Sequence, residues 1–430
     1  MQELILSRHG LVICGRETIS WPAFAAGADM FWSFWEYRNI GKNTHCQGLY
    51  HRFWCWEVFQ NIPTDPGERH RLVAYLLLSS RSQKCSDLRD KLFALFSLVR
   101  KLGFHVSLPD YERSETDLYE EAVIQYIKQY GSLFLLEQSP RSSREDSRLP
   151  TWVPDFNREV VFSPLTLAAI PLVSTSKVDT DLLDRRTFRT LPLRGKRLAH
   201  VTLVSSGHSI SRQSTRDLPH RLTTDSKWDQ TLQDWCDFAD FADRFPCLSK
   251  GETYATSLAR LLSRLVDAER KVTILARHQS EPIDPHEALP RPFRTYCERL
   301  HSFIKGHTGE TCSSTSAVTA VKKLLGRLQS KDGKSTYLVP DEDLAIQGYI
   351  SRSICEQKLV LTSSMHLGRG PNIVQEQDVI VLFVGARVPF IIRPAGSNYE
   401  FVGPVEVQGT PFELDWDLGD VMELEIFTLK

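Results

Sequence analysis

The sequence predicts an α+β fold: a helical N-terminal half, then a strand-rich, barrel or sandwich-like C-terminal domain with a helical insertion. Three patterns predict this order. Apolar residues recur at helical spacing over residues 20–130. Pro150 and Pro154 stop helical structure, since each proline restricts the residue before it to extended conformations. From residue 358 onward, short segments rich in β-branched residues alternate with turn residues, which is typical of strands.

The first two helices are expected to pack through aromatic faces. Pro22 suits the first turn of one helix, and Pro63 would close the other. Their apolar faces would consist of Phe24, Ala28, Phe31, Trp32 and Trp35 in the first helix, and of Leu49, Phe53, Trp56 and Phe59 in the second.

Two further helices are better specified. One is expected over Ser86–Leu102, with Asp87 as its N-terminal cap. The other is expected over Ser114–Tyr130, because Ser114 can cap it and Gly131 can end it. The two are predicted to pack against each other through Leu88, Leu92, Leu95, Phe96 and Val99 of the first, and through Leu118, Ala122, Val123, Tyr126 and Ile127 of the second.

The strand-rich part is expected to begin before the insertion. Residues 188–206 alternate like strand, with Arg194-Gly195-Lys196 as a turn. They should pair with strands from residues 358–430, because unpaired strand backbone is costly to bury. Those later strands are expected at Lys358–Ser363, Asp378–Val384, Val388–Arg393, Tyr399–Gly403 and Met422–Leu429, with Ala395–Asn398 as a hairpin turn.

Composition limits the function classes. Of 430 residues, 41% are hydrophobic and 24% charged, which is ordinary for a globular protein. The 52 Lys and Arg nearly balance the 53 Asp and Glu, so no overall field favours nucleic acid or an anionic membrane. Nine scattered cysteines without a Cys-x-x-Cys pair are typical of a reducing compartment. This cysteine pattern leads us to expect a cytoplasmic protein. No apolar run approaches the roughly 20 residues of a spanning helix, so we expect no membrane segment.

Two motifs approach cofactor sites without matching them. Gly326 and the Gly333-Lys334-Ser335 run have six residues between their glycines, whereas a phosphate-binding loop has four. His45, Cys46, His51 and Cys55 lack the paired spacing of zinc ligands and share a segment with aromatic residues, so a helical core explains them better. Neither a Gly-x-Ser-x-Gly elbow nor a nucleophilic cysteine signature is present. We therefore expect no catalytic residue, cofactor or metal, and an enzyme is the less favoured class.

Two other segments allow a structural and a functional interpretation. The charged helix start Asp87–Lys91 could be catalytic or bind phosphate, but an acid there stabilises the helix dipole and Arg89 needs only a neighbouring carboxylate. Trp152, between two prolines, could stack on a sugar or a base, but such aromatic residues also pack over domain junctions. In both cases the structural interpretation is favoured.

Several blocks, in this order, resemble the fungal heterokaryon incompatibility family. The N-terminal blocks are Arg89-Asp90-Lys91, Pro109-Asp110-Tyr111 and the run from Leu149 to Phe156, which contains Trp152, Pro154 and Asp155. The C-terminal blocks contain Gly368, Gly370, Pro389, Arg393 and Gly409. The chain departs from the family at Gln377, where glycine is usual, and at Gln408, where histidine is usual. The resemblance implies that these residues occupy the family's motif positions, where a structural role is favoured over a functional one.

The family's defining N-terminal module opens with a Leu-Ser-Tyr-type strand and a Trp-Ile-Asp run, which this sequence does not contain. By resemblance, the chain is expected to be truncated and to start at that module's tail. Leu4–Leu6 and Leu11–Ile13 would then be short buried segments joined by a turn, whose natural neighbours are missing strands. Such an open face should promote association.

The resemblance also implies a domain plan and a function. Residues 1–160 would hold the remnant of the incompatibility domain plus a helical region, 161–212 the junction and first strands, 213–345 the helical insertion, and 346–430 the β-rich domain. The implied function is self/nonself recognition linked to programmed cell death, through contacts with other protein chains. Two alternatives stay open: an NAD-cleaving or other hydrolytic enzyme whose catalytic module is mostly missing, and an inert truncated remnant.

Overall fold

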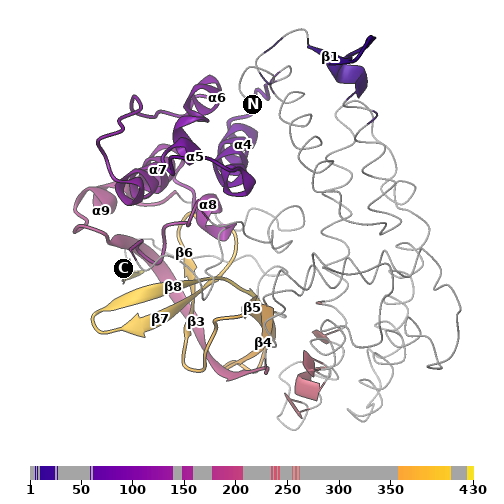
Figure 1. Ribbon diagram of the computed structural model, residues 1–430. Coiled ribbons are helices and arrows are strands. Elements are labelled where there is room, and N and C mark those ends of the chain that lie inside the picture. The colour runs from indigo at the N-terminus through magenta and orange to yellow at the C-terminus, as the bar shows by residue number, and fades with distance from the viewer. Residues whose placement is uncertain are drawn as a thin grey trace, which may run out of the picture.

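The computed structural model describes residues 10–24, 62–138, 148–157, 177–206, 357–407 and 424–430, with single residues and runs of two or three elsewhere (Figure 1). Within these ranges the chain has a layer of helices over a large strand-rich sheet, which confirms the mixed class. Several predicted features lie almost wholly outside the described residues: the aromatic helices at 24–35 and 49–59, the insertion at 213–345, and both near-matches to cofactor motifs.

The helical layer covers one side of the strands. Figure 1 shows α4 to α7 grouped on one side of the strands, with α8 between α4 and the sheet. The elements are α4 (Pro66–Ser79), η1 (Ser80–Ser82), α5 (Asp90–Phe93), α6 (Phe96–Lys101), α7 (Glu115–Tyr130), α8 (Phe134–Glu137) and α9 (Thr180–Asp184).

The helix α7 matches its prediction at both ends. Ser114 caps it by accepting a hydrogen bond from the Asp117 backbone N–H at 3.1 Å. Gly131 ends it in the left-handed conformation, with φ of 63°. Val123 on its expected apolar face is fully buried, and Leu92 on the facing segment is too.

The single helix expected over Ser86–Leu102 is wrong, because the structure has α5 and α6 with a break at Ala94 and Leu95. At the break the backbone hydrogen bond spans three residues instead of four, because the Leu95 N–H donates to Leu92 O at 2.8 Å. The reason is burial: seven of the nine side chains from Lys91 to Val99 are buried, more than one stripe of a straight helix can present. The break lets both pieces face the core.

Eight strands form one sheet in the order β10-β8-β7-β6-β3-β4-β5-β9, and β10 also pairs with β3. A ring therefore forms from β3, β6, β7, β8 and β10, and the eight-stranded sheet that contains this ring is called the barrel. The sheet closes a second time, because β9 follows β8 after one residue and pairs with β5. The strands are β3 (Leu191–Val204), β4 (Gln357–Thr362), β5 (Leu367–Pro371), β6 (Val379–Phe383), β7 (Phe390–Ala395), β8 (Asn398–Pro404), β9 (Glu406–Val407) and β10 (Glu425–Leu429).

The predicted pairing of residues 188–206 with later strands is confirmed, but the turn within them is wrong. The strand β3 runs without interruption through Gly195, which pairs with Phe383 of β6 and Glu425 of β10. A Cβ atom on Gly195 would lie 2.8 Å from Leu382 O, so the glycine permits a close approach of two strands. The strand β5 was not among the expected strands, because two of its five residues are glycines, which are depleted in strands.

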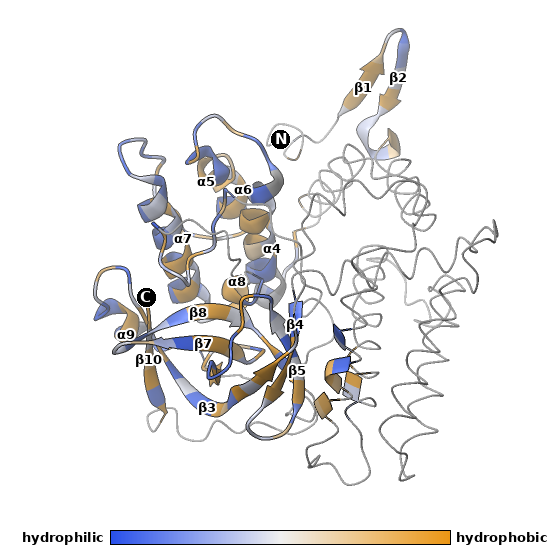
Figure 2. Cartoon of the chain, turned by 60° about the horizontal axis from the view of Figure 1, so that its bottom comes forward, coloured by the Kyte–Doolittle hydropathy of each residue, from blue (hydrophilic) through white to orange (hydrophobic). Residues whose placement is uncertain are grey.

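The sheet separates two apolar cores. On one face, strand residues such as Phe383, Phe390 and Phe401 join the core of the helical layer. On the other face, Ile380 and Ile391 belong to a smaller core inside the second closure. Figure 2 shows hydrophobic residues, coloured orange, along the strands beneath the helices. Because strand side chains alternate, the same strands hold both cores together.

Near the N-terminus, β1 (Leu11–Cys14) and β2 (Glu17–Ser20) form an antiparallel hairpin (Figure 1). The expectation that Leu11–Ile13 is buried is wrong, since Leu11 and Ile13 are each 70% exposed. Both side chains lie on one face of a two-stranded ribbon, which has no second layer of its own to cover them. Ile5, by contrast, is fully buried in the core of the helical layer.

Candidate functional site

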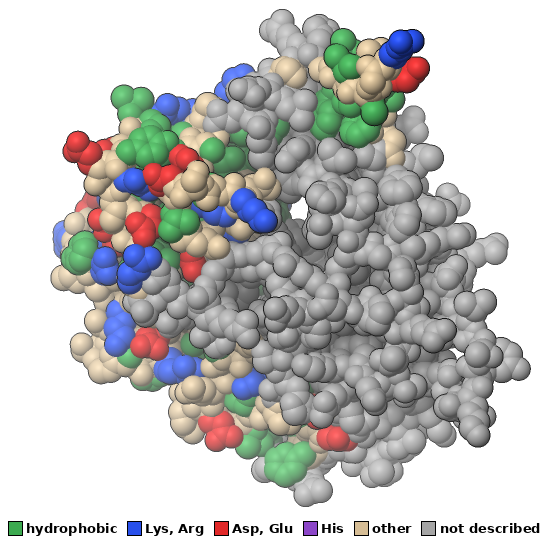
Figure 3. All heavy atoms as spheres, in the orientation of Figure 1, with side chains coloured by type: hydrophobic (Ala, Val, Ile, Leu, Met, Phe, Trp, Pro, Cys, Tyr) green, Lys and Arg blue, Asp and Glu red, His purple; other side chains and the backbone are tan. Residues whose placement is uncertain are grey.

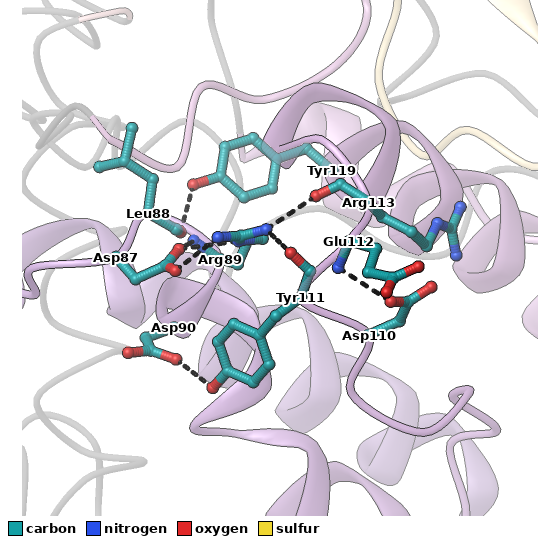
Figure 4. Close-up of polar contacts among 9 residues, drawn as sticks. All are labelled: Asp87, Leu88, Arg89, Asp90, Asp110, Tyr111, Glu112, Arg113 and Tyr119. Atoms are coloured by element: carbon teal, nitrogen blue, oxygen red, sulfur yellow. Dashed lines mark hydrogen bonds and ion pairs between the residues drawn. The ribbon is translucent and has the colours of Figure 1, made fainter.

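Arg89, in the first family block, clamps the start of α5 to the loop before α7 (Figure 4). Its Nε and Nη2 atoms lie 2.9 and 2.7 Å from the two carboxylate oxygens of Asp87. Its Nη1 atom donates to the backbone carbonyls of Tyr111 and Arg113. The hydrogen bonds from Arg89 lower the pKa of Asp87, and Asp87 in turn raises the pKa of Arg89. This bidentate pair fixes the guanidinium in one orientation.

The second family block lies against the first. The Tyr111 hydroxyl donates to Asp90 Oδ1 at 2.7 Å, which raises the pKa of Tyr111 (Figure 4). The Tyr111 ring lies edge-on to Phe93 and beneath the Arg89 guanidinium. Asp110 holds its own turn by accepting a bond from the Glu112 N–H at 2.9 Å. Pro109, immediately before it, restricts the loop further.

Lys91 completes the first block and is buried. Its Nζ atom donates to the backbone carbonyls of Ser80 at 3.0 Å, Arg81 at 3.3 Å and Gln83. These carbonyls belong to η1 and the residue after it, and the Ser80 carbonyl also accepts the Gln83 N–H at 2.9 Å. All three ammonium donors therefore have acceptors, and Lys91 ties the end of α4 and η1 to α5.

The third block reaches the same place through Tyr119 of α7. The Tyr119 hydroxyl lies 2.7 Å from the carbonyl oxygen of Leu88 and 2.8 Å from Asn157 Oδ1. Burial raises the pKa of this hydroxyl. Asp155, also buried, accepts a bond from the Asn157 N–H at 2.9 Å. The structure thus brings together three blocks that are far apart in the sequence.

The turn that carries Trp152 joins the helical layer to the barrel. Thr151 donates its N–H to Lys430 O at 2.9 Å, and its hydroxyl oxygen accepts from the Phe401 N–H at 2.8 Å. Trp152 is 1% exposed and belongs to the core of the helical layer, so its faces are not available to stack on a sugar or a base. Pro154 is also buried. The geometry supports the structural interpretation of this block.

The C-terminal blocks lie in the barrel. A Cβ atom on Gly368 would lie 2.6 Å from Glu406 O, and one on Gly370 would lie 2.8 Å from Ile391 Cδ1. Both glycines therefore permit close packing of β5. Between them Arg369 is buried, and it donates to Glu406 at 2.6 Å and to Gln357 at 2.9 Å. Sequence reasoning missed this network, although an arginine between two glycines was a signal.

Arg393 forms a second fork-like pair in the barrel. Its Nε and Nη2 atoms lie 2.8 and 2.9 Å from the carboxylate oxygens of Asp378, and Nη2 also donates to Ile373 O at 2.8 Å. The pair raises the pKa of Arg393. Pro389 accepts a backbone bond from Val405 at 3.0 Å. Gly409 lies outside the described residues.

Taken together, the described family-block residues join α4, α5, α7 and the barrel. Their polar groups bind backbone carbonyls, backbone N–H groups or each other, which is the chemistry of a scaffold. Within the described ranges no three His, Cys, Asp or Glu residues are placed to hold a metal ion. Nor does any described helix have the length and apolar character needed to cross a bilayer. Figure 3 shows acidic, basic and apolar side chains interspersed over the helical layer.

A comparison with known protein families also points to a barrel. Residues 224–428 match the family model of the Het-6 beta-barrel domain. This family is found in fungal heterokaryon incompatibility proteins. The Het-6 match includes β4 to β9 and nearly all of β10, begins after β3, and runs across the segment predicted as an insertion. Neither the curated proteins nor the solved structures gave a significant match.

Proposed function

We propose that this chain is a fungal self/nonself recognition protein of the heterokaryon incompatibility type. It would act in the cytoplasm through contacts with other protein chains and would be linked to programmed cell death. The observation that carries the proposal is the Het-6 match over residues 224–428, which contains the described strands of the closed sheet except β3 and the end of β10. The family blocks of the N-terminal half add support, because they converge on one joint in the fold.

Surface chemistry supports protein contacts as the mode of action. Leu108 is 76% exposed and Tyr111 52% exposed, and both belong to the loop that Arg89 clamps. Leu88 at the start of the same clamp is 38% exposed. Large apolar side chains on a fixed loop can bind a partner without the entropy cost of ordering that loop.

Transformation of a panel of fungal strains with the gene tests the proposal. Some recipient strains should give far fewer viable transformants than others, because only certain partners would trigger death. Gly368→Val should abolish this difference, since a Cβ there meets the Glu406 carbonyl at 2.6 Å and would open the β5–β9 edge. Lys196→Ala, at an exposed position of β3, is the matched control and should retain the difference.

A second variant separates contact from folding. Leu108→Asp changes an exposed position, so the protein level should stay normal while the death response falls. Equal viability in every recipient strain, with the protein present at normal level, would contradict the proposed function. A normal response from Leu108→Asp would move the contact surface elsewhere.

A further inference from the structure

Glu137, the last residue of α8, lies where the helical layer meets the turn between β6 and β7. Its side chain is buried, and its Oε1 atom accepts a hydrogen bond from the Arg387 N–H at 2.6 Å. Its other oxygen, Oε2, has no hydrogen-bond partner among the residues that the structure describes. A buried carboxylate with one unsatisfied oxygen is costly when ionised and much less costly when protonated.

Backbone bonds beside Glu137 show that this is a tight joint. The Leu133 N–H donates to Gly385 O at 2.9 Å, and the Val178 N–H donates to Gly131 O at 3.1 Å. A Cβ atom on Gly385 would lie 2.6 Å from Gly131 O, so the two backbones are nearly in contact. An unfavourable charge here would act directly on the contact between helices and barrel.

The groups around Glu137 keep one charge state near neutral pH. Burial lowers the pKa of His70 to about 4 and raises the pKa of Tyr130 to about 12. Burial also raises the pKa values of Tyr75 and Tyr126 above their ordinary value. The described groups that interact with the carboxyl are Arg71 and Tyr75 from α4, Tyr126 from α7 and Arg387 from the turn. His70 faces Arg387, and Tyr130 contacts the His70 ring. Arginines stay protonated in this range.

Glu137 itself behaves differently. Burial raises its pKa from 4.5 to about 7, against the opposing effect of Arg387 and Arg71. Below pH 4.5 the carboxyl is protonated in the closed and the open joint alike, and its full contribution to stability is present. As the pH rises from 4.5 to 7, the open joint loses its proton first, so this contribution falls until the folded pKa is passed.

We propose that Glu137 is a proton-dependent clasp, which in its neutral form holds α8 against the β6–β7 turn and on losing its proton loosens the helical layer from the barrel. The linkage relation for these two pKa values gives about a tenfold rise in the opening equilibrium of the joint from pH 6 to pH 8. Of the described groups that face the joint, Glu137 is the one that changes charge in this interval.

Hydrogen–deuterium exchange of the full chain at pH 6, 7 and 8 tests the clasp. After correction for intrinsic exchange, amides of 131–138 and 384–390 should exchange about tenfold more readily at pH 8 than at pH 6. Glu137→Gln keeps the Oε1 acceptor but cannot ionise, so this dependence should vanish. Glu120→Gln is the matched control, because Glu120 is also buried but is paired with Arg186 at 2.8 Å; it should keep the dependence.

A tenfold dependence that persists in Glu137→Gln would overturn the proposal. If that variant does not fold, carbon-13 NMR of the wild-type protein, labelled at its glutamate carboxyl carbons, decides the matter. A buried carboxyl that titrates with a midpoint between pH 6 and 8 supports the clasp. The absence of such a midpoint rejects it.

Discussion

The buried pair of Arg369 and Glu406 should be strongly coupled in its effect on stability. The Arg369 side chain is 2% exposed and the Glu406 side chain 9% exposed, with 2.6 Å between Nε and Oε2. Removing either partner takes the buried counter-charge from the other side chain, which costs about 3–5 kcal/mol. Arg369→Met also takes a donor from Gln357, which adds about 1 kcal/mol. Each single variant should therefore lose much of the protein's stability.

The double variant Arg369→Met/Glu406→Leu should recover most of that loss. It replaces the ion pair by apolar groups of similar size, an exchange that is often neutral or stabilising. Its free energy of unfolding should fall by no more than about 2 kcal/mol, so the coupling energy should be at least about 5 kcal/mol. Urea denaturation followed by circular dichroism measures all four proteins, and equal m-values would show that the unfolding reaction is unchanged.

The same cycle on Arg197 and Glu425 provides the control. These partners also lie on neighbouring barrel strands, 3.2 Å apart, but their side chains are 45% and 56% exposed. Solvent screening should keep their coupling below about 1 kcal/mol. Equal coupling in the two pairs, or additive effects at Arg369 and Glu406, would show that burial does not decide the strength of this network.

Four further outcomes are expected. Leu92→Ala should cost about 2–5 kcal/mol because the side chain is fully buried, and Val123→Asp should cost more than the alanine change, both measured by denaturation. Ser114→Ala should cost about 1 kcal/mol by removing the cap of α7, while leaving the pH profile of exchange unchanged. Purified protein should neither cleave NAD nor bind ATP, as judged by product chromatography and calorimetry. The chain alone should associate in gel filtration, and replacing Leu11 and Ile13 by serine should reduce this association if the exposed hairpin causes it.

Local signals predicted local structure well. The Ser114 cap, the Gly131 end and the Ala395–Asn398 turn all stand where the sequence places them, and Gly396 has φ of 72°. Each of these depends on one or two residues whose backbone preference dominates. The pairing of residues 188–206 with later strands was also predictable, because an isolated strand needs a partner.

Long-range packing explains the misses. Gly195 reads as a turn residue in isolation, yet the structure places it in the middle of β3, where three neighbouring groups leave no space for a side chain. The break between α5 and α6 at Leu95 depends on how many side chains of this segment the core can bury. Glu137 and Arg387 are far apart in the sequence, and only the closed fold shows that they meet. No periodicity along one segment carries such information.

The strand β3 is synthesised long before β10, with which it pairs in the folded protein. Leu191 leaves the ribosome long before its partner Leu429, and at roughly 5–20 residues per second the wait is about 10–50 s. During this interval the first strand of the barrel has an unpaired edge and an uncovered apolar face. A growing chain would therefore depend on chaperones that bind apolar strands, and a slow codon in the intervening stretch would lengthen that exposure.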